Sequence, residues 1–399
     1  MARSSSSRLK FLTMPESARG TIPSSALQIA RITGIRKKAS KQSVQSDELR
    51  LDRQITSFAE VGQAANLGLD VEWSYGTFDE WLAGLLFNAW TTPVTVTGSS
   101  NISFTSGTKK ITQSGASFDT QFLVGQILRV KGTTNNGSNS VPKFFTITAL
   151  SATEITVAET LTTENNTSAV LYTCCIRNWF DAESDGGFVD KSYTAELEPT
   201  DLSSIFANQR GMTFNTLDLN IASRQKITGQ FGLMGLQFAT ATATVGTGSA
   251  TAATTTDILN ATSNVAALMK DGAAFANAVR DLRLQFSNNL YELPAVGQKY
   301  AVDINPGQFA VTGNFNPYFE DKAMLDAFIN HTETALRIDV QDSAGNRQII
   351  SLPSVYFGGG DAGPEATANN QPTSTQLPLQ CRRHPTMGFT VQISRFPAS

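Results

Sequence analysis

The sequence LGLDVEWSYGTFDEWLAGLLFNAW, residues 67–90, changes its hydrophobic period partway along. In its first third, apolar residues alternate with small or polar residues, which is typical of a β-strand with one buried face. In its second half, apolar residues recur at helical spacing, and Thr77 and Glu80 have the spacing of a capping box. The stretch therefore predicts a strand, a tight turn and an amphipathic helix.

The same change of period returns in QFAVTGNFNPYFEDKAMLDAFIN, residues 308–330. Pro317 suits a first helical position, and Glu320 and Asp321 suit an acidic first turn. The recurrence predicts an internal duplication, so we expect a mainly β protein with two tandem modules. Each module is expected to be a β-barrel or sandwich with one flanking α-helix. The first module comprises residues 27–92 and 176–238, and the second comprises residues 279–399.

The segments between and around these modules have different textures. Residues 93–175 contain short β-branched and aromatic runs separated by Gly, Asn and Ser, which predicts a small inserted all-β domain. Residues 239–278 are rich in Ala and Thr and are interpreted as an exposed linker or arm. Residues 1–26 show no period and are expected to form a disordered tail or an arm that orders on a neighbouring subunit. Residues 36–54 are highly charged and predict a solvated loop long enough to have a function.

Composition narrows the possible functions of the chain. Among 399 residues, charged residues make up only 16%, against about 25% in an ordinary soluble domain. Much of the surface is therefore expected to be uncharged or covered in an assembly. The formal net charge of −3 gives no general attraction to nucleic acid. No apolar run is long enough to span a membrane, the N-terminus has no signal-peptide pattern, and three cysteines give neither a disulfide framework nor a zinc spacing.

Candidate catalytic and metal-binding residues are few. His331 and His384 lack neighbours at metal-ligand spacing, and the cysteine and two arginines that precede His384 are interpreted as a solvated turn. The glycines at 358–360 are not followed by a Lys-Ser or Lys-Thr pair, so they do not form a P-loop. We expect no catalytic residue, no metal, no cofactor and no enzymatic activity. The recurring acidic feature is a set of carboxylates on polar strand faces, which fits an ordinary wet sheet face equally well: Asp70, Glu72, Glu196, Glu198 and Asp218.

Three stretches carry a resemblance to a known family: GIRKKASKQSV, AANLGLDVEWSYGTFDEWLAGLLFNAW and KSYTAELEPTDLSSIFANQRGMTFNTLDLNIASRQKITGQFGLMG. With the duplication and the insert, they resemble the tail tube proteins of long-tailed bacteriophages (siphophages), in the subgroup with two tube modules per chain. The resemblance implies a structural virion protein of the viral tail that forms stacked rings, through which DNA passes during ejection. A two-module chain implies a trimer with pseudo-sixfold symmetry. It also implies assembly in the host cytoplasm, tape measure, tail terminator and distal tail proteins as partners, and no membrane.

The resemblance suggests roles for two sets of residues. The five strand-face carboxylates become candidates for lining the lumen, where negative charge disfavours adhesion of DNA phosphates. Four basic residues of the charged segment become candidates for contacts between rings: Arg36, Lys37, Lys38 and Lys41. The insert is expected to decorate the outside of the tube and to be replaceable by a short linker.

Two other classes of protein remain as alternatives. One is a surface adhesin or another β-rich structural protein with a carbohydrate-binding insert, which exposed Trp or Tyr pairs on the insert would favour. Residues 93–172 contain no Trp and only one Tyr, Tyr172. A hydrolase with an unrecognised serine–histidine site is disfavoured because the chain has only two histidines.

Overall fold

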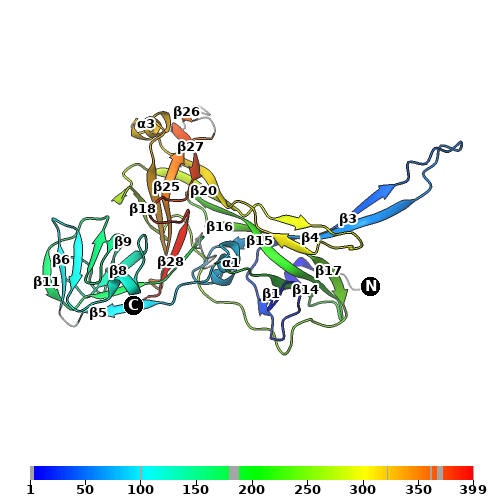
Figure 1. The fold of residues 1–399 in the computed structure, drawn as a ribbon, viewed down its shortest axis with the longest axis horizontal. Helices are drawn as coiled ribbons and strands as arrows, with labels where there is room; N and C mark the ends of the chain where they lie inside the picture. The colour runs from blue at the N-terminus through cyan, green and yellow to red at the C-terminus, as the bar shows by residue number, and fades with distance from the viewer. Residues whose placement is uncertain are drawn as a thin grey trace.

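The computed structural model describes residues 4–98, 101–178, 188–320, 322–359, 362–365 and 372–398. The described chain is mainly β, as the sequence predicts, and its sheets are open. Figure 1 shows a central body, an inserted domain at one end and a long β-hairpin that projects from the opposite end.

A continuous antiparallel sheet forms the centre of the body. Each of its strands pairs with the next over several residues. In order across the sheet, the strands are β3 (Gly34–Gln45), β4 (Phe58–Glu72), β16 (Thr228–Gly235), β15 (Phe206–Ala222), β20 (Val279–Ser287), β23 (Ala310–Pro317) and β27 (Ser374–Cys381). The predicted alternation holds, because Leu69, Leu219 and Leu284 are buried while their neighbours along each strand face solvent.

Two outer sheets grow from this central sheet. The first half of β15 pairs with β14 (Tyr193–Pro199) and β17 (Gln237–Ala241), and β14 pairs with β1 (Leu9–Pro15), which pairs with β2 (Gln28–Ile29). In the C-terminal part, β25 (Arg347–Phe357) pairs with β24 (Thr334–Gln341), β27 and β28 (Gln392–Phe396). Strand β24 also pairs with β18 (Val265–Lys270), which pairs with β19 (Ala273–Ala274). Strand β28 also pairs with β13 (Cys175–Arg177).

The N-terminal segment differs from its expectation. After a 3₁₀ turn, η1 (Ser6–Arg8), strand β1 pairs with β14 of the same chain. Phe11 and Leu12 on β1 are buried in the chain's own interior. The expectation of a disordered tail or an arm on a neighbouring subunit is therefore wrong for β1, because this strand satisfies its backbone groups and buries its apolar side chains within one chain.

Both predicted strand–helix units are present. Helix α1 (Asp79–Leu85) follows β4, and helix α3 (Ala323–Ile329) follows β23. The apolar face of α1 packs into an aromatic cluster in which Trp81 lies 5.2 Å from Phe231 and 5.7 Å from Phe214 between ring centroids. Burying one such side chain stabilises the fold by about 1.5–3 kcal/mol.

The predicted helix starts are wrong in detail. Helix α1 has no side-chain cap, since Thr77 Oγ1 contacts Thr254 Oγ1 at 2.7 Å and Glu80 binds Lys191 at 2.8 Å. Pro317 ends β23 and does not begin α3. Tertiary partners for these polar groups replace the local capping that the spacing suggested.

Within the predicted insert, residues 94–173 form an eight-stranded sheet of their own. Its strands, in order across the sheet, are β11 (Glu164–Thr167), β6 (Ile102–Thr105), β7 (Lys110–Gln113), β10 (Glu154–Val157), β9 (Lys143–Leu150), β8 (Ile127–Lys131), β12 (Val170–Thr173) and β5 (Val94–Thr97). Phe118 of a short helix, α2 (Phe118–Gln121), joins residues such as Phe104 and Ile147 in a separate buried core.

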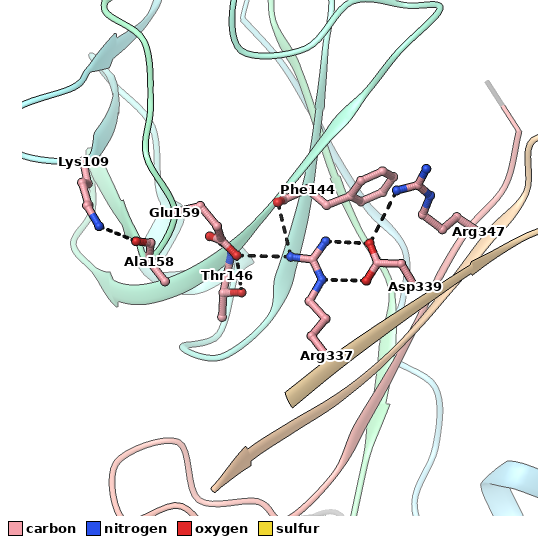
Figure 2. Close-up of polar contacts among 8 residues, drawn as sticks. All are labelled: Lys109, Phe144, Thr146, Ala158, Glu159, Arg337, Asp339 and Arg347. Atoms are coloured by element: carbon pink, nitrogen blue, oxygen red, sulfur yellow. Dashed lines mark hydrogen bonds and ion pairs between the residues drawn. The ribbon is translucent and has the colours of Figure 1, made fainter. Parts of the chain in front are cut away.

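The inserted domain is fused to the C-terminal sheet by shared buried contacts. Figure 2 shows Arg337 of β24 between Glu159 of the insert, at 3.2 Å, and Asp339, at 2.8 Å. All three side chains are at least nine-tenths buried. Phe144 of the insert packs against Phe396 of β28, with ring centroids 4.9 Å apart. A small cluster of buried side chains, apart from the insert's own core, therefore joins the insert to the second half of the chain.

The Ala/Thr-rich segment is an extended strap over the body. Leu259 is buried, its N–H donates to the Trp73 carbonyl at 2.8 Å, and its carbonyl accepts from the Ile227 N–H at 2.9 Å. Farther along, Asn264 accepts from the Gln341 N–H at 2.7 Å, and the segment ends in β18 and β19. The interpretation as an exposed linker is wrong for this part, because its backbone groups bond to both halves of the chain.

None of the helices in the described ranges has the length and apolar character needed to cross a membrane.

Candidate functional site

One face of the central sheet is lined by polar side chains from six strands. The strand register places one row of opposed residues across this face: Asp70, Gln230, Asp218, Gln285, Thr312 and Gln380. A one-residue slip of any strand would bury its polar set, so this face is well specified. The neutral members of the row were not singled out from the sequence, because only the pairing between strands shows that they are neighbours.

The carboxylates of this polar face are paired with cations. Asp218 accepts hydrogen bonds from Arg283 Nε at 2.6 Å and from Gln285 Nε2 at 3.2 Å. Asp70 accepts from Arg36 and, at 2.7 Å, from Gln230 Nε2. Burial raises the pKa of the Asp218 carboxyl, but the bonds from Arg283 and Gln285 outweigh it and hold that pKa below its usual value. The face is polar and charge-balanced around these two residues.

The five candidate carboxylates separate into three environments. Asp70, Glu72 and Asp218 lie on the polar face, where Glu72 pairs with Lys226. Glu198 lies on β14 in an outer sheet and pairs with Lys10 at 3.0 Å, so it is not brought together with the other three.

Glu196 is a correction to the prediction. Its side chain is completely buried, and its carboxylate accepts from Thr244 Oγ1 at 2.6 Å and from the Val245 N–H at 2.8 Å. The alternation along β14 fails because the strap covers the side that was expected to face solvent. Glu196 therefore lines no surface of the folded chain.

The charged segment 36–54 is mostly strand. Residues 36–45 belong to β3, which pairs with β4 to form the projecting hairpin of Figure 1. The prediction of a loop is wrong for these residues because both faces of the hairpin meet solvent, so no apolar alternation marks it. Lys41 pairs with Glu60 at 2.9 Å, and Lys41 and Lys299 lower the pKa of Glu60 to about 2. The side chains of Lys37 and Lys38 lie outside the described part of the structure.

The end of the hairpin exposes apolar side chains. Leu49 and Leu51 are fully exposed, and Ile55 and Phe58 are more than half exposed. Arg36 lies at the base of this hairpin on the polar face, away from these residues. Apolar groups gathered on a projecting element are typical of a contact site.

A joint inside the chain connects its two halves. Strand β15 pairs with β20 over seven residue pairs. Beside this joint, the buried Asn288 donates through Nδ2 to the Leu85 carbonyl at 2.8 Å and to the Phe214 carbonyl at 2.9 Å. Leu290 packs with Phe87 just beyond the end of α1.

Two strand edges resemble the two sides of this joint but have no described partner. Strand β15 pairs with β14 along one edge and with β17 and then β16 along the other. Strand β25 has the same arrangement, with β24 along one edge and β28 and then β27 along the other. On the edge of β15 that carries β14, the later residues pair with β20. On the corresponding edge of β25, which carries β24, the later residues Tyr356 and Phe357 pair with no described strand. Strand β3, which stands to β4 as β20 stands to β23, pairs with β4 alone among the described strands.

The histidines and the cysteine that were considered for catalysis have structural contacts or are buried. His331 stacks on Tyr356, and His384 Nδ1 accepts from the Thr386 and Met387 N–H groups. Burial raises the pKa of the Cys381 thiol to about 12, so the reactive thiolate is disfavoured. Within the described ranges, no three His, Cys, Asp or Glu side chains come together as a metal site.

These features define a mainly β protein whose notable surfaces are a polar sheet face, a projecting hairpin and two strand edges that meet no described strand. The sequence model of the family described as phage tail tube protein matches residues 6–372. The chain belongs to this family, and it is a structural component of a phage tail. A comparison with curated proteins gives no match.

Proposed function

We propose that the chain forms rings that stack into the tail tube, and that the tube conducts DNA during genome ejection. The observation that carries this proposal is that β3 and the end of β25, which meet no further described strand at one edge, resemble the two sides of the internal joint. Pairing β3 of one copy with β25 of the next would continue the central sheet from chain to chain. Such a head-to-tail contact closes into a ring when its rotation permits. Three copies, with two strand–helix units each, would give the pseudo-sixfold ring that the family resemblance implied.

The unequal burial of the two helices supports the same arrangement. Five of the seven residues of α1 are buried, and Asn288, in the segment that follows β20, donates to the Leu85 carbonyl at the end of α1. In α3 only Met324 and Ala327 are buried, while Ile329 is 66% exposed. A second copy, with β3 in the place of β20, would cover α3 as the second half of the chain covers α1.

The polar face would then line the lumen, with Asp70, Glu72 and Asp218 among its residues. A conduit must not retain its cargo, and every phosphate that it neutralises adds affinity for DNA. A face of Gln, Thr, Asn and paired charges avoids this affinity. The projecting hairpin would contact the adjacent ring through its apolar end. The tape measure, tail terminator and distal tail proteins would be partners of the finished tube, which assembles in the host cytoplasm.

Electron microscopy of the purified chain after concentration tests this proposal. We expect rings or tubes in negative stain, and a preparation that stays monomeric at all concentrations contradicts the proposal. Ile329→Asp should prevent ring formation, because it places a charge in the expected contact of α3. Val141→Asp provides a matched control, since Val141 is 68% exposed and lies on the insert. Equal assembly of the two variants would show that α3 is not at the contact.

A further inference from the structure

The ion pairs of the polar face balance positive and negative charge. Each of three ion pairs joins one carboxylate to one cation. The face carboxylates are Asp70, Glu72 and Asp218. The face cations are Arg36, Lys226 and Arg283.

The face cations would be accessible to a ligand in solution if their carboxylate partners were absent. Their side chains are 48–54% exposed, whereas those of the carboxylates are 24–36% exposed. Asp70, Asp218 and Arg283 line one shallow hollow in the sheet, with Gln230 between the two acids. The carboxylates thus lie deeper in the face, and the cations reach over them toward solvent.

The ion pairs also connect neighbouring strands of the sheet. Arg283 and Asp218 connect β20 to β15 across the joint between the two halves, and Arg36 and Asp70 connect β3 to β4. Cross-strand pairs of opposite charge stabilise a sheet modestly. This role accounts for cations on a face that neutral side chains could otherwise cover.

Guanidinium and ammonium groups bind phosphate through the same donors that bind carboxylate. Arg283 donates Nε and Nη2 to Asp218, which is the two-donor geometry that a phosphate would use. A polyanion would therefore compete with the carboxylates for these donors, and the carboxylates are held in place by neighbouring strands.

We propose that the face carboxylates mask the face cations. The sheet then contains a cryptic binding site for polyanions such as duplex DNA, and the chain's own carboxylates block that site. The meaning of this masking for DNA passage rests on the proposed function. The masking itself is a property of the single chain, because all six residues belong to one copy.

The test compares amide variants in a DNA-binding assay. The variant Asp70→Asn/Glu72→Gln/Asp218→Asn keeps the size of each side chain but removes its charge. Binding of a short fluorescent DNA duplex is measured by anisotropy at several NaCl concentrations, under conditions in which the chain is dispersed. We expect no measurable binding by the wild type at low salt. The variant should bind, with log K falling against log [salt] at a slope of up to about −2.7 for three phosphates.

A second variant identifies the groups that bind. Adding Arg36→Gln, Lys226→Gln and Arg283→Gln to the amide variant should return binding to the wild-type level. The proposal is overturned if the folded amide variant binds no better than wild type, or if binding survives removal of the face cations. If the triple variant does not fold, Asp218→Asn with and without Arg283→Gln gives the same comparison, with a slope of up to about −0.9.

Electron microscopy of the same preparations separates this proposal from the proposed function. Wild-type protein that forms no tubes, together with an amide variant that gains DNA binding, would contradict the tube and leave the masking intact. Wild-type tubes with no gain of binding in the amide variant would contradict the masking alone.

Discussion

At the scale of single residues, Asp218 shows how a carboxylate is fixed on the polar face. Burial raises its pKa, but hydrogen bonds from Arg283 and Gln285 outweigh this effect, and the pKa is lowered. The pKa of an aspartate in an unfolded chain is about 3.9. Because the folded pKa is lower, Asp218 contributes stability above that pH, and the contribution is lost as the pH falls through the folded pKa.

We predict that Asp218→Asn lowers the free energy of unfolding at neutral pH by up to about 1 kcal/mol, as for other partly exposed ion pairs. The difference from wild type should shrink as the pH falls below about 4, where the wild-type carboxyl also becomes neutral. Denaturant unfolding at a series of pH values measures both effects. A difference that stays constant down to the acid limit would show that the charge of Asp218 has no part in it.

At the scale of elements, the β3–β4 hairpin depends on no core of its own for most of its length. Residues 41–45 of β3 and 58–61 of β4 are exposed, so backbone pairing holds this part together. Its apolar end is therefore more easily explained by a partner than by folding of the hairpin. Fully exposed Leu49 and Leu51 make no core contact whose loss would destabilise the chain.

We predict that Leu49→Ser/Leu51→Ser/Ile55→Ser leaves the melting temperature unchanged and permits single rings but shortens or abolishes tubes. The reason is that the change removes apolar area only from the contact between rings. Thermal unfolding and negative-stain images provide the measurements, and Val141→Ser on the insert is the control. Tubes of normal length from the triple variant would place the contact between rings elsewhere.

The inserted domain is the second element whose buried contacts bear on an expectation from the sequence. Replacing it with a Gly/Ser linker was expected to leave ring formation intact, but the insert covers Ile349 and Phe396 and supplies Glu159 to the buried Arg337. Removal of one partner from a buried ion network costs several kcal/mol.

We predict that replacing residues 94–173 with a short linker lowers the melting temperature of the remaining chain and reduces its soluble yield. Exposed apolar surface on β25 and β28 and the loss of Glu159 both contribute. A linker placed only in the exposed turn at residues 106–109 should have little effect. A deletion variant that melts like wild type would show that the insert is an independent attachment.

At the scale of the whole molecule, the two halves share one interior. The main core contains Leu69 and Phe231 from the first half together with Leu284 and Val391 from the second. Trp73 Nε1 also donates to Gln348 Oε1 at 2.8 Å, which connects the residue just after β4 to β25. The halves are therefore expected to unfold together.

We predict that Asn288→Ala lowers the free energy of unfolding by about 1–3 kcal/mol, because it leaves the buried carbonyls of Leu85 and Phe214 without this donor. Calorimetry should show one transition for the wild type and a lower or broadened one for the variant. Asn165→Ala, on strand β11 of the insert, serves as an exposed control. Equal unfolding of the two variants would mean that Asn288 is not part of the joint.

The sequence by itself determined the elements that have a local period. The alternation in residues 67–73 and the helical spacing that follows predicted β4 and α1, and the Gly-separated runs predicted the β-rich insert. The sequence also placed Asp70, Glu72 and Asp218 on the polar sides of their strands. These features follow from which side chains along one segment meet the core, and that information lies within a few residues.

Only the tertiary structure decided what those segments meet. Strand β3 has no apolar alternation because both sides of its outer part are exposed, and β1 is a strand because β14 lies beside it. Glu196 is buried because Thr244 and Val245 of the strap fold over it. Arg283 balances Asp218 from the other half of the chain. Each of these outcomes depends on a partner distant in sequence, and a local period carries no information about which partner a strand face or edge will meet.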